Sequence, residues 1–307
     1  MSINVVFLGT SGAIPTLKRS LPSAVIECPK ELLMFDCGEN TQRQMMNSKV
    51  SFHKKLTVLL THLHGDHVLG LPGVLQTMAL MDRKEPVRVY GPKGIKDFLV
   101  CTKETLNFGL TFPVEIYEVL SEGLIVAEDN YTVTAVKSNH AVESYSFAFT
   151  EKPRPGKFYP KKAKDLGVPV GELWSQLQRG EKITLPDGKV VESNDVMGPP
   201  RSGRKIVYTG DTRPFPAFAE FAAGADIVIH ESTFDDSLTE KAALDGHSTP
   251  SQAAAEAKAA GAMQLVLTHI SARYSDTTLL LEQAKKIFAD TLVAEDFMRL
   301  ELPLKES

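Results

Sequence analysis

Three histidines and one aspartate lie within six residues of one another, in the segment Thr61-His62-Leu63-His64-Gly65-Asp66-His67. The segment directly follows residues 56–60, an apolar run that predicts a β-strand. Imidazole and carboxylate groups together suit zinc, manganese or iron. One compact turn cannot wrap all four groups around a single ion in good geometry. The pattern therefore predicts two adjacent metal ions at the end of this strand.

Three more metal-capable side chains occupy the same kind of position. His140 follows the segment 131–139, Asp211 follows 206–210, and His269 follows 265–268. Each lies just past the carboxyl end of an apolar strand, where open α/β sheets place their ligands. Any one of them alone would more often be structural. Because all three recur in one kind of position, we expect them to join the cluster at 62–67.

Short strands alternate with helices along most of the chain, which favours a layered α/β domain over a β-barrel. We interpret residues 1–307 as one such domain. The helices are expected at 40–47, with Asn40 as N-cap, and at 68–81, 93–100, 217–222, 250–260 and 278–288. The strands are expected at 4–8, 23–27, 32–35, 56–60, 87–90, 131–136, 144–149, 206–209, 227–229, 265–267 and 298–302.

The composition is that of an ordinary soluble protein. Of the 307 residues, 43% are hydrophobic and 23% are charged, which excludes a disordered chain, a collagen-like fibre and a disulfide-stapled miniprotein. No apolar run approaches the roughly 18 residues of a membrane helix, and no signal peptide is visible. Three cysteines at unrelated spacings fit reduced thiols. We therefore expect a cytoplasmic protein without a membrane segment.

Residues 151–203, called the insertion below, interrupt the alternation with a stretch rich in proline, glycine and lysine. Between 151 and 182 there are eight basic and four acidic side chains, although the whole chain has a net charge of −4. From charge alone, this basic stretch is either a solvated surface or a binding surface. The apolar residues between Leu166 and Leu177 predict a small cluster with a short helix near Leu173.

The order of metal-capable residues resembles the metallo-β-lactamase superfamily over nearly the whole chain. That resemblance implies an αββα sandwich with two metal ions at one edge. It implies that His62, His64 and His140 hold one ion, that Asp66, His67 and His269 hold the other, and that Asp211 bridges them.

Other segments narrow the resemblance to the ribonuclease Z family, endonucleases that mature the 3′ end of tRNA. They are 7–15 (FLGTSGAIP), 35–39 (FDCGE), 90–94 (YGPKG), 230–234 (HESTF), 247–249 (HST) and 267–274 (LTHISARY). The length is that of the short form, and the insertion lies where the family has its tRNA-binding arm. The family's arm tip reads Pro-Pro-Gly-Pro, whereas this chain has Pro169-Val170-Gly171-Glu172. The resemblance also implies a homodimer and precursor tRNA as substrate.

The expected chemistry is hydrolysis of a phosphodiester, because two adjacent metal ions can lower the pKa of a water and stabilise an in-line phosphoryl displacement. Asp66 is the candidate general base, as the resemblance also implies. His247 is the candidate donor of a proton to the leaving oxygen, and Glu231 is the candidate residue that orients His247. The loop at Gly9 and Gly12 lacks the spacing of a dinucleotide-binding motif, and its glycines are expected to let it pass close to the metal site or to phosphate.

Two rival interpretations remain. One is a hydrolase of the same fold that acts on a small phosphodiester, sulfate ester or thioester, which fold and metals alone do not exclude. The insertion disfavours it, because a small substrate needs no basic segment of this size. The other is a non-catalytic RNA-binding protein, which the intact set of metal positions disfavours. Two equivalents of zinc per purified chain would separate an enzyme from an inert binding module.

Overall fold

The computed structural model describes residues 3–305 and consists of two compact units. The first unit contains the chain up to Ala127, Thr132–Phe149 and Lys205–Pro303. The second contains Glu128–Tyr131, Thr150–Arg204 and the chain from Leu304 on. No helix among residues 3–305 is long and apolar enough to cross a membrane.

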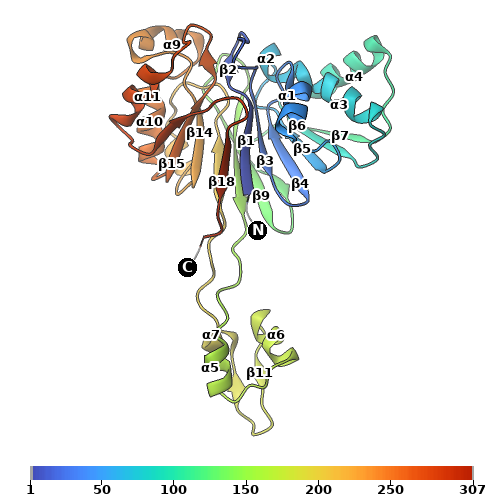
Figure 1. Cartoon of the computed structure of the whole chain (residues 1–307), viewed down its shortest axis with the longest axis vertical. Helices are drawn as coiled ribbons and strands as arrows, with labels where there is room; N and C mark the ends of the chain where they lie inside the picture. Colours follow the sequence, from blue (N-terminus) through green and yellow to red (C-terminus); the bar gives the residue numbers. More distant parts are fainter. Residues whose placement is uncertain (1–2, 306–307) are drawn as a thin grey trace. The chain divides into compact units, whose positions relative to one another are not determined.

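Two seven-stranded sheets form the centre of the first unit (Figure 1). In the first sheet the strands are ordered β18-β1-β3-β4-β5-β6-β7, antiparallel from β18 to β4 and parallel from β4 to β7. Its strands are β18 (Arg299–Leu302), β1 (Ile3–Gly9), β3 (Ser23–Glu27), β4 (Glu31–Phe35), β5 (Lys55–Leu59), β6 (Val87–Gly91) and β7 (Val114–Glu118).

The second sheet has the order β17-β15-β14-β13-β10-β9-β8, and β13, β14, β15 and β17 are parallel. Its strands are β17 (Thr291–Val293), β15 (Gln264–Thr268), β14 (Ile227–Glu231), β13 (Lys205–Tyr208), β10 (Tyr145–Glu151), β9 (Tyr131–Lys137) and β8 (Gly123–Ala127). A small parallel pair joins β2 (Ser11–Gly12) to β16 (Ile270–Ser271).

Helices cover the outer faces of both sheets (Figure 1). Apolar side chains of the first sheet pack against α1, α3 and α4, and those of the second pack against α8, α10 and α11. The layers are therefore helix, sheet, sheet, helix, which confirms the predicted αββα sandwich. The helices are α1 (Thr41–Ser48), α2 (Gly65–Val68), α3 (Gly70–Leu80), α4 (Ile95–Leu106), α8 (Phe218–Phe221), α9 (Thr239–Asp245), α10 (Pro250–Ala259) and α11 (Thr278–Lys285), with a 3₁₀ turn, η1, at Asp236–Leu238.

Aromatic rings join the inner faces of the two sheets. Phe35, at the end of β4, stacks on Tyr208 of β13 with ring centroids 5.1 Å apart, and it lies 6.4 Å from the ring of Phe147 on β10. All three residues are almost fully buried. Stacked aromatic pairs add to the free energy gained by burial and favour one relative orientation. The ends of β4 and β13 are therefore held together, next to the loops that follow them.

Two helix predictions need correction. The predicted helix 68–81 is α3, and only its first residue, Val68, belongs to the separate helix α2, because the Gly70 N–H donates to the carbonyl oxygen of Cys37 instead of continuing α2. Asn40 does stand at the N-cap of α1, but its side chain makes no cap hydrogen bond and its φ is +73°. The Asn40 amide donates to Ser20 Oγ instead, so a contact distant in sequence displaces the local cap.

The second unit has its own small apolar core. Seven of its apolar residues are buried, and Leu173 and Trp174 pack against them. Val170, which was expected in this cluster, is 70% exposed. The elements around this core are α5 (Pro160–Asp165), α6 (Glu172–Gln178), α7 (Ser193–Val196), β11 (Ile183–Thr184) and β12 (Val190–Val191), and α6 is the short helix predicted near Leu173.

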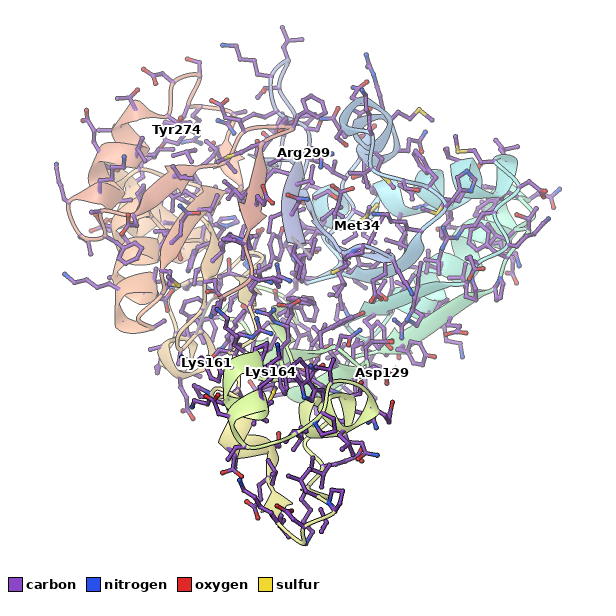
Figure 2. All side chains as sticks on the ribbon, turned by 60° about the horizontal axis from the view of Figure 1, so that its bottom comes forward. Met34, Asp129, Lys161, Lys164, Tyr274 and Arg299 are labelled. Carbon is purple, nitrogen blue, oxygen red and sulfur yellow. The ribbon has the colours of Figure 1, made fainter. Side chains whose placement is uncertain are left out.

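The surface of the second unit is basic. Lys157, Lys161 and Lys164 are exposed, and the last two lie on α5 (Figure 2). Glu172, at the departure from the family's arm tip, forms an ion pair with Arg179, with Oε1 and Nη2 2.9 Å apart. Arg179 also pairs with Glu181, with Nε and Oε1 2.8 Å apart, so one positive charge serves both carboxylates. Where the insertion begins and ends, Arg204 donates two hydrogen bonds of 2.6 Å to the Glu151 carboxylate.

Candidate metal centre

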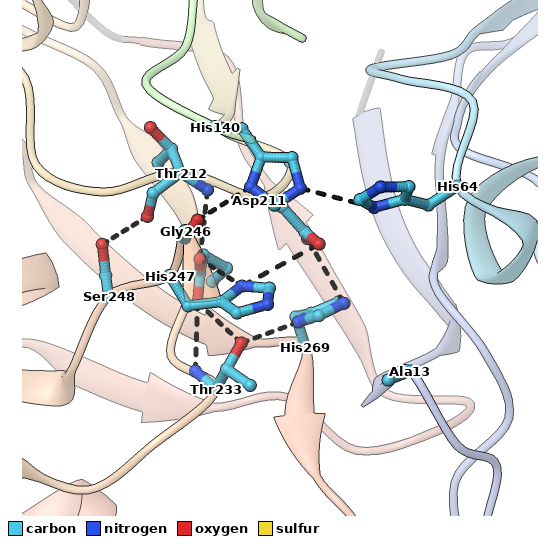
Figure 3. Close-up of polar contacts among 12 residues, drawn as sticks. Ala13, His64, His140, Asp211, Thr212, Thr233, Gly246, His247, Ser248 and His269 are labelled. Carbon is cyan, nitrogen blue, oxygen red and sulfur yellow. Dashed lines mark hydrogen bonds and ion pairs between the residues drawn. The ribbon is translucent and has the colours of Figure 1, made fainter. Parts of the chain in front are cut away.

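His62, His64 and His140 form the first group of candidate ligands. His62 and His64 follow β5, and His140 follows β9. His64 Nδ1 lies 3.0 Å from His62 Nε2 and 3.4 Å from His140 Nε2, and Figure 3 shows His64 and His140 facing each other. Three imidazole nitrogens from two strands of different sheets thus converge on one point.

Asp66, His67 and His269 form the second group. Asp66 and His67 lie in the single turn of α2, and His269 lies between β15 and β16 with a φ of +56°. His67 Nε2 is 3.3 Å from His269 Nε2, and each of these nitrogens is 3.5 Å from Asp66 Oδ2. The ring of His269 leaves no room for a side chain at position 12, since a Cβ on Gly12 would lie 2.6 Å from it. The glycine loop therefore passes close to the site, as expected.

Asp211, which follows β13, faces both groups. Its Oδ2 is 3.7 Å from His62 Nε2, and its Oδ1 is 3.3 Å from His67 Nε2 and 3.2 Å from His269 Nε2. Oδ1 is fully buried and has no hydrogen-bond partner. A buried carboxylate oxygen without a donor is costly unless a cation fills its place. The position of Asp211 fits a bridge between two cations.

The spacing of the ligand atoms also fits divalent metal ions. Metal–nitrogen bonds of about 2.0–2.1 Å in tetrahedral geometry place neighbouring ligand atoms about 3.3 Å apart. Five distances between ligand atoms within the two groups range from 3.0 to 3.5 Å. The residues present therefore suit a pair of ions, one in each group, with Asp211 between them.

Burial and neighbouring charges shift the pKa values of Asp211 and His62. Burial would raise the pKa of Asp211, but the charges of His269 and His67 outweigh it and hold that pKa well below its usual range. Burial and the neighbouring His67 lower the pKa of His62 well below its ordinary value. His62 is therefore neutral, with a lone pair available, while Asp211 remains charged.

Each candidate histidine except His64 has its Nδ1 held by an outer partner, which directs its Nε2 into the site. The Nδ1–H of His67 donates to Asp36 Oδ2 (2.7 Å), and that of His62 donates to Thr61 Oγ1 (2.9 Å). The Nδ1–H of His140 donates to the Gly246 carbonyl (2.8 Å), and that of His269 donates to Thr233 Oγ1 (2.8 Å). Such partners fix the tautomer and the ring orientation of metal ligands. His64 instead presents Nδ1 to the site.

Two buried carboxylates support the two sides of the centre in the same way. The Thr61 hydroxyl, which accepts from His62, donates to Asp36, and the Thr233 hydroxyl, which accepts from His269, donates to Glu231. Each carboxylate thus holds one imidazole through a threonine. Each also holds a second imidazole directly, His67 on Asp36 and His247 on Glu231.

His247 lies beside the second group. Its Nδ1–H donates to Glu231 Oε1 at 2.9 Å, and its ring stacks on that of His269 with centroids 5.3 Å apart. Burial lowers the pKa of His247, but the charge and hydrogen bond of Glu231 outweigh it and raise that pKa to about 9. An imidazole with a raised pKa keeps a proton to donate at neutral pH.

The start of α10 fixes the position of His247. A capping box between Thr249 and Gln252 and a proline at the first helical position define where this helix begins. The Ser248 hydroxyl donates to the Thr212 carbonyl at 2.7 Å (Figure 3). Gly246 has a φ of +92°, and a Cβ there would lie 2.7 Å from His140 Nδ1. Only glycine fits this turn between the first ligand group and His247.

Comparison with known proteins identifies the family. A family model described as "Beta-lactamase superfamily domain" matches residues 192–270, and one described as "Anti-Pycsar protein Apyc1" matches residues 3–153. Ribonuclease Z of Methanosarcina acetivorans is 44% identical over 304 residues, which are 99% of each chain. The chain belongs to the ribonuclease Z family. It is therefore an enzyme, a nuclease of the metallo-β-lactamase superfamily.

Solved structures agree with this assignment to the ribonuclease Z family. The crystal structure of human tRNase Z, short form, has a TM-score of 0.73 and 30% identity, and the match covers 98% of this chain and 100% of that one. The metallo-β-lactamase fold protein YhfI from Bacillus subtilis, 20% identical with a TM-score of 0.68, shares the fold over 98% of this chain and 99% of its own.

All seven metal ligands that were predicted from the sequence lie together in the structure, and His247 and Glu231 lie beside them. His230 is fully buried and pairs with Glu256 at 3.0 Å, and His53 is exposed, so both lie outside the candidate centre. Sequence reasoning assigned no role to Asp36, Thr61 or Thr233. The position of Asp36 at the end of β4 is the one signal that could have pointed to it.

Proposed function

We propose that this chain is a zinc-dependent endoribonuclease that removes the 3′ trailer from precursor tRNA in the cytoplasm. The products are a 3′-hydroxyl on the tRNA and a 5′-phosphate on the trailer. The convergence of two ligand groups on the shared carboxylate of Asp211 is the observation that supports this best. The names of the relatives, ribonuclease Z and tRNase Z, support the choice of substrate.

His62, His64, His140 and Asp211 would hold one ion, and Asp66, His67, His269 and Asp211 the other. Two bound cations would lower the pKa of a water and stabilise negative charge at phosphorus. Zinc fits this imidazole-rich set best, and manganese or iron also accept it. Zinc content and activity after replacement of the metal would decide among them.

Asp66 is the proposed general base. The Ala13 N–H donates to its Oδ2 at 2.9 Å, so the carboxylate is held at the second ligand group. Asp66 would take a proton from the attacking water as its oxygen bonds to phosphorus. The bond from phosphorus to the 3′ oxygen of the tRNA breaks in the same displacement.

His247 is the proposed general acid. Its Nδ1–H group donates to Glu231. The proton on Nε2 is therefore the one that His247 would give to the leaving 3′ oxygen. Glu231 is itself fixed by the N–H groups of Thr212 and Thr233, at 3.0 and 3.1 Å. A carboxylate held in this way keeps the imidazole in one orientation.

The exposed lysines of the insertion are proposed to contact tRNA phosphates. Such contacts supply affinity through counterion release and make binding dependent on salt. We also propose a homodimer in which the insertion of one chain serves the active site of the other. Light scattering at micromolar concentration should give twice the mass of one chain, and a clean monomer would refute the dimer.

The experiment that tests this function incubates the purified protein with a precursor tRNA and maps both new ends. Cleavage at the 3′ end of the mature tRNA, with a ligatable 5′-phosphate on the trailer, is the expected result. An intact precursor, in a preparation that holds two zinc equivalents and hydrolyses a small phosphodiester, would favour the rival small-substrate hydrolase.

A further inference from the structure

Asp36 is a buried carboxylate at the junction of the two sheets. It directly follows β4 and has no exposed surface. Its Oδ1 accepts the N–H and the hydroxyl of Thr61 at 2.8 and 3.0 Å, and its Oδ2 accepts the Nδ1–H of His67 at 2.7 Å. These donors belong to the segment that follows β5 of the first sheet. Asp36 thereby directs the Nε2 atom of His67 into the second ligand group.

Tyr208 reaches the same carboxylate from the second sheet. It is the last residue of β13, it is 3% exposed, and its hydroxyl donates to Asp36 Oδ2 at 2.9 Å. Its ring is held by the stack on Phe35, with 11° between the ring planes. Neither the mechanism nor the ligand set described above uses this hydroxyl.

These contacts close a ring across the sandwich. Tyr208 lies three residues before Asp211, whose Oδ1 is 3.3 Å from His67 Nε2. His67 is bound to Asp36, and Asp36 is bound to Tyr208. The Tyr208 hydroxyl therefore ties the strand that carries Asp211 to the carboxylate that orients His67.

We propose that Tyr208 is a positioning residue for the second metal ion. Its hydroxyl anchors Asp36, and Asp36 holds His67 at the correct distance from Asp211. The inference rests on the proposed metal centre and extends it to a residue outside the ligand set. Outer partners of metal ligands commonly contribute 10–100-fold to metal affinity. The first ligand group reaches this ring through Asp211 and, by way of the Thr61 hydroxyl, through His62. Asp36 holds His67 directly and His62 only through Thr61, so the larger effect should fall on the second ion.

The test is Tyr208→Phe, which keeps the stacked ring and removes one oxygen. Tyr145→Phe is the matched control, because Tyr145 is also fully buried in the second sheet and donates to a carboxylate, Glu143, at 3.1 Å. Zinc release is followed during titration with a chromogenic chelator. His140→Ala and His269→Ala, which each lack a ligand of one group, assign the two release steps.

We expect Tyr208→Phe to weaken the second zinc equivalent by about 10–100-fold and to leave the first within about twofold of wild type. Tyr145→Phe should leave both unchanged. In an Asp36→Asn background, the further change Tyr208→Phe should have little effect on zinc affinity, because the residue acts through Asp36. The melting temperatures of the metal-free Tyr208→Phe and Tyr145→Phe proteins should be alike.

Three results would overturn the inference. Unchanged affinity for both zinc equivalents would mean that the Tyr208 hydroxyl has no role in metal binding. Equal weakening of both, or a Tyr208→Phe chain that does not fold without metal, would mean that the hydroxyl is generally structural. A wild-type protein that binds no zinc would instead overturn the proposed metal centre, and this inference with it. Measurement of the wild type first therefore distinguishes the two failures.

Discussion

The metal centre and the insertion differ in how their polar side chains are held. In the metal centre, buried imidazoles and carboxylates fix one another through hydrogen bonds of 2.7–2.9 Å. In the insertion, Lys157, Lys161 and Lys164 are exposed, and the buried residues are an apolar core of modest size. The proposed chemistry of the centre therefore depends on the position of single atoms, whereas the proposed binding of tRNA by the insertion depends on its exposed positive charges and on its own folding.

Asp66→Ala should separate the two regions most clearly, because it should lower turnover and leave the binding of tRNA intact. The change removes a proposed ligand and the proposed base, so turnover should fall by at least about 10³-fold. Binding of precursor tRNA should persist, because the lysines of the insertion remain. Single-turnover cleavage and filter binding measure the two quantities, with Asp290→Ala, an exposed aspartate, as control. Near-normal turnover would refute the role of Asp66.

A second substitution in the metal centre, His247→Ala, should slow turnover by about 10²–10⁴-fold while zinc content stays at the wild-type value. His247 lies near enough to Asp211 and His269 to be a ligand, so zinc content is the deciding measurement. Loss of one zinc equivalent would make His247 a ligand rather than the proton donor. Glu231→Gln, which leaves the ring in place, should have a smaller effect on turnover.

A smaller effect is expected in the insertion, and on KM rather than on turnover. Replacing Lys157, Lys161 and Lys164 together by glutamine should raise KM for precursor tRNA by about tenfold and make its salt dependence shallower. The control replaces Lys258, Lys285 and Lys286, three exposed lysines of the outer helix layer, with the same change in charge. Equal effects in both triple variants would mean that net charge alone matters.

The same contrast explains what the sequence could predict. The ligands of the metal centre follow strands at regular positions, so their residue types and spacing were enough to group them. The strand alternation also predicted most of both sheets. Strands β7, β8 and β17 of the two sheets were missed, although the alternation of Val114, Glu115 and Ile116 in β7 is a visible signal. All three are edge strands, and most of their side chains are partly buried or exposed, which weakens the apolar pattern.

The outer partners of the histidines could not be predicted in the same way. Thr233 meets His269 across 36 residues, and Tyr208 meets Asp36 across 172. No local period marks which hydroxyl or carboxylate will reach which imidazole, because the packing of the two sheets decides it. The break at Leu69 and the displaced cap at Asn40 have the same origin, a contact with a distant segment.

In the proposed function, the metal centre cuts precursor tRNA and the insertion binds it. Deletion of residues 152–203, with a short Gly-Ser link that retains Glu151 and Arg204, tests it most directly. KM for precursor tRNA should rise by at least about tenfold, while hydrolysis of a small chromogenic phosphodiester stays near the wild-type rate, since all seven proposed ligands lie outside the deletion. Equal loss of both activities would contradict the account.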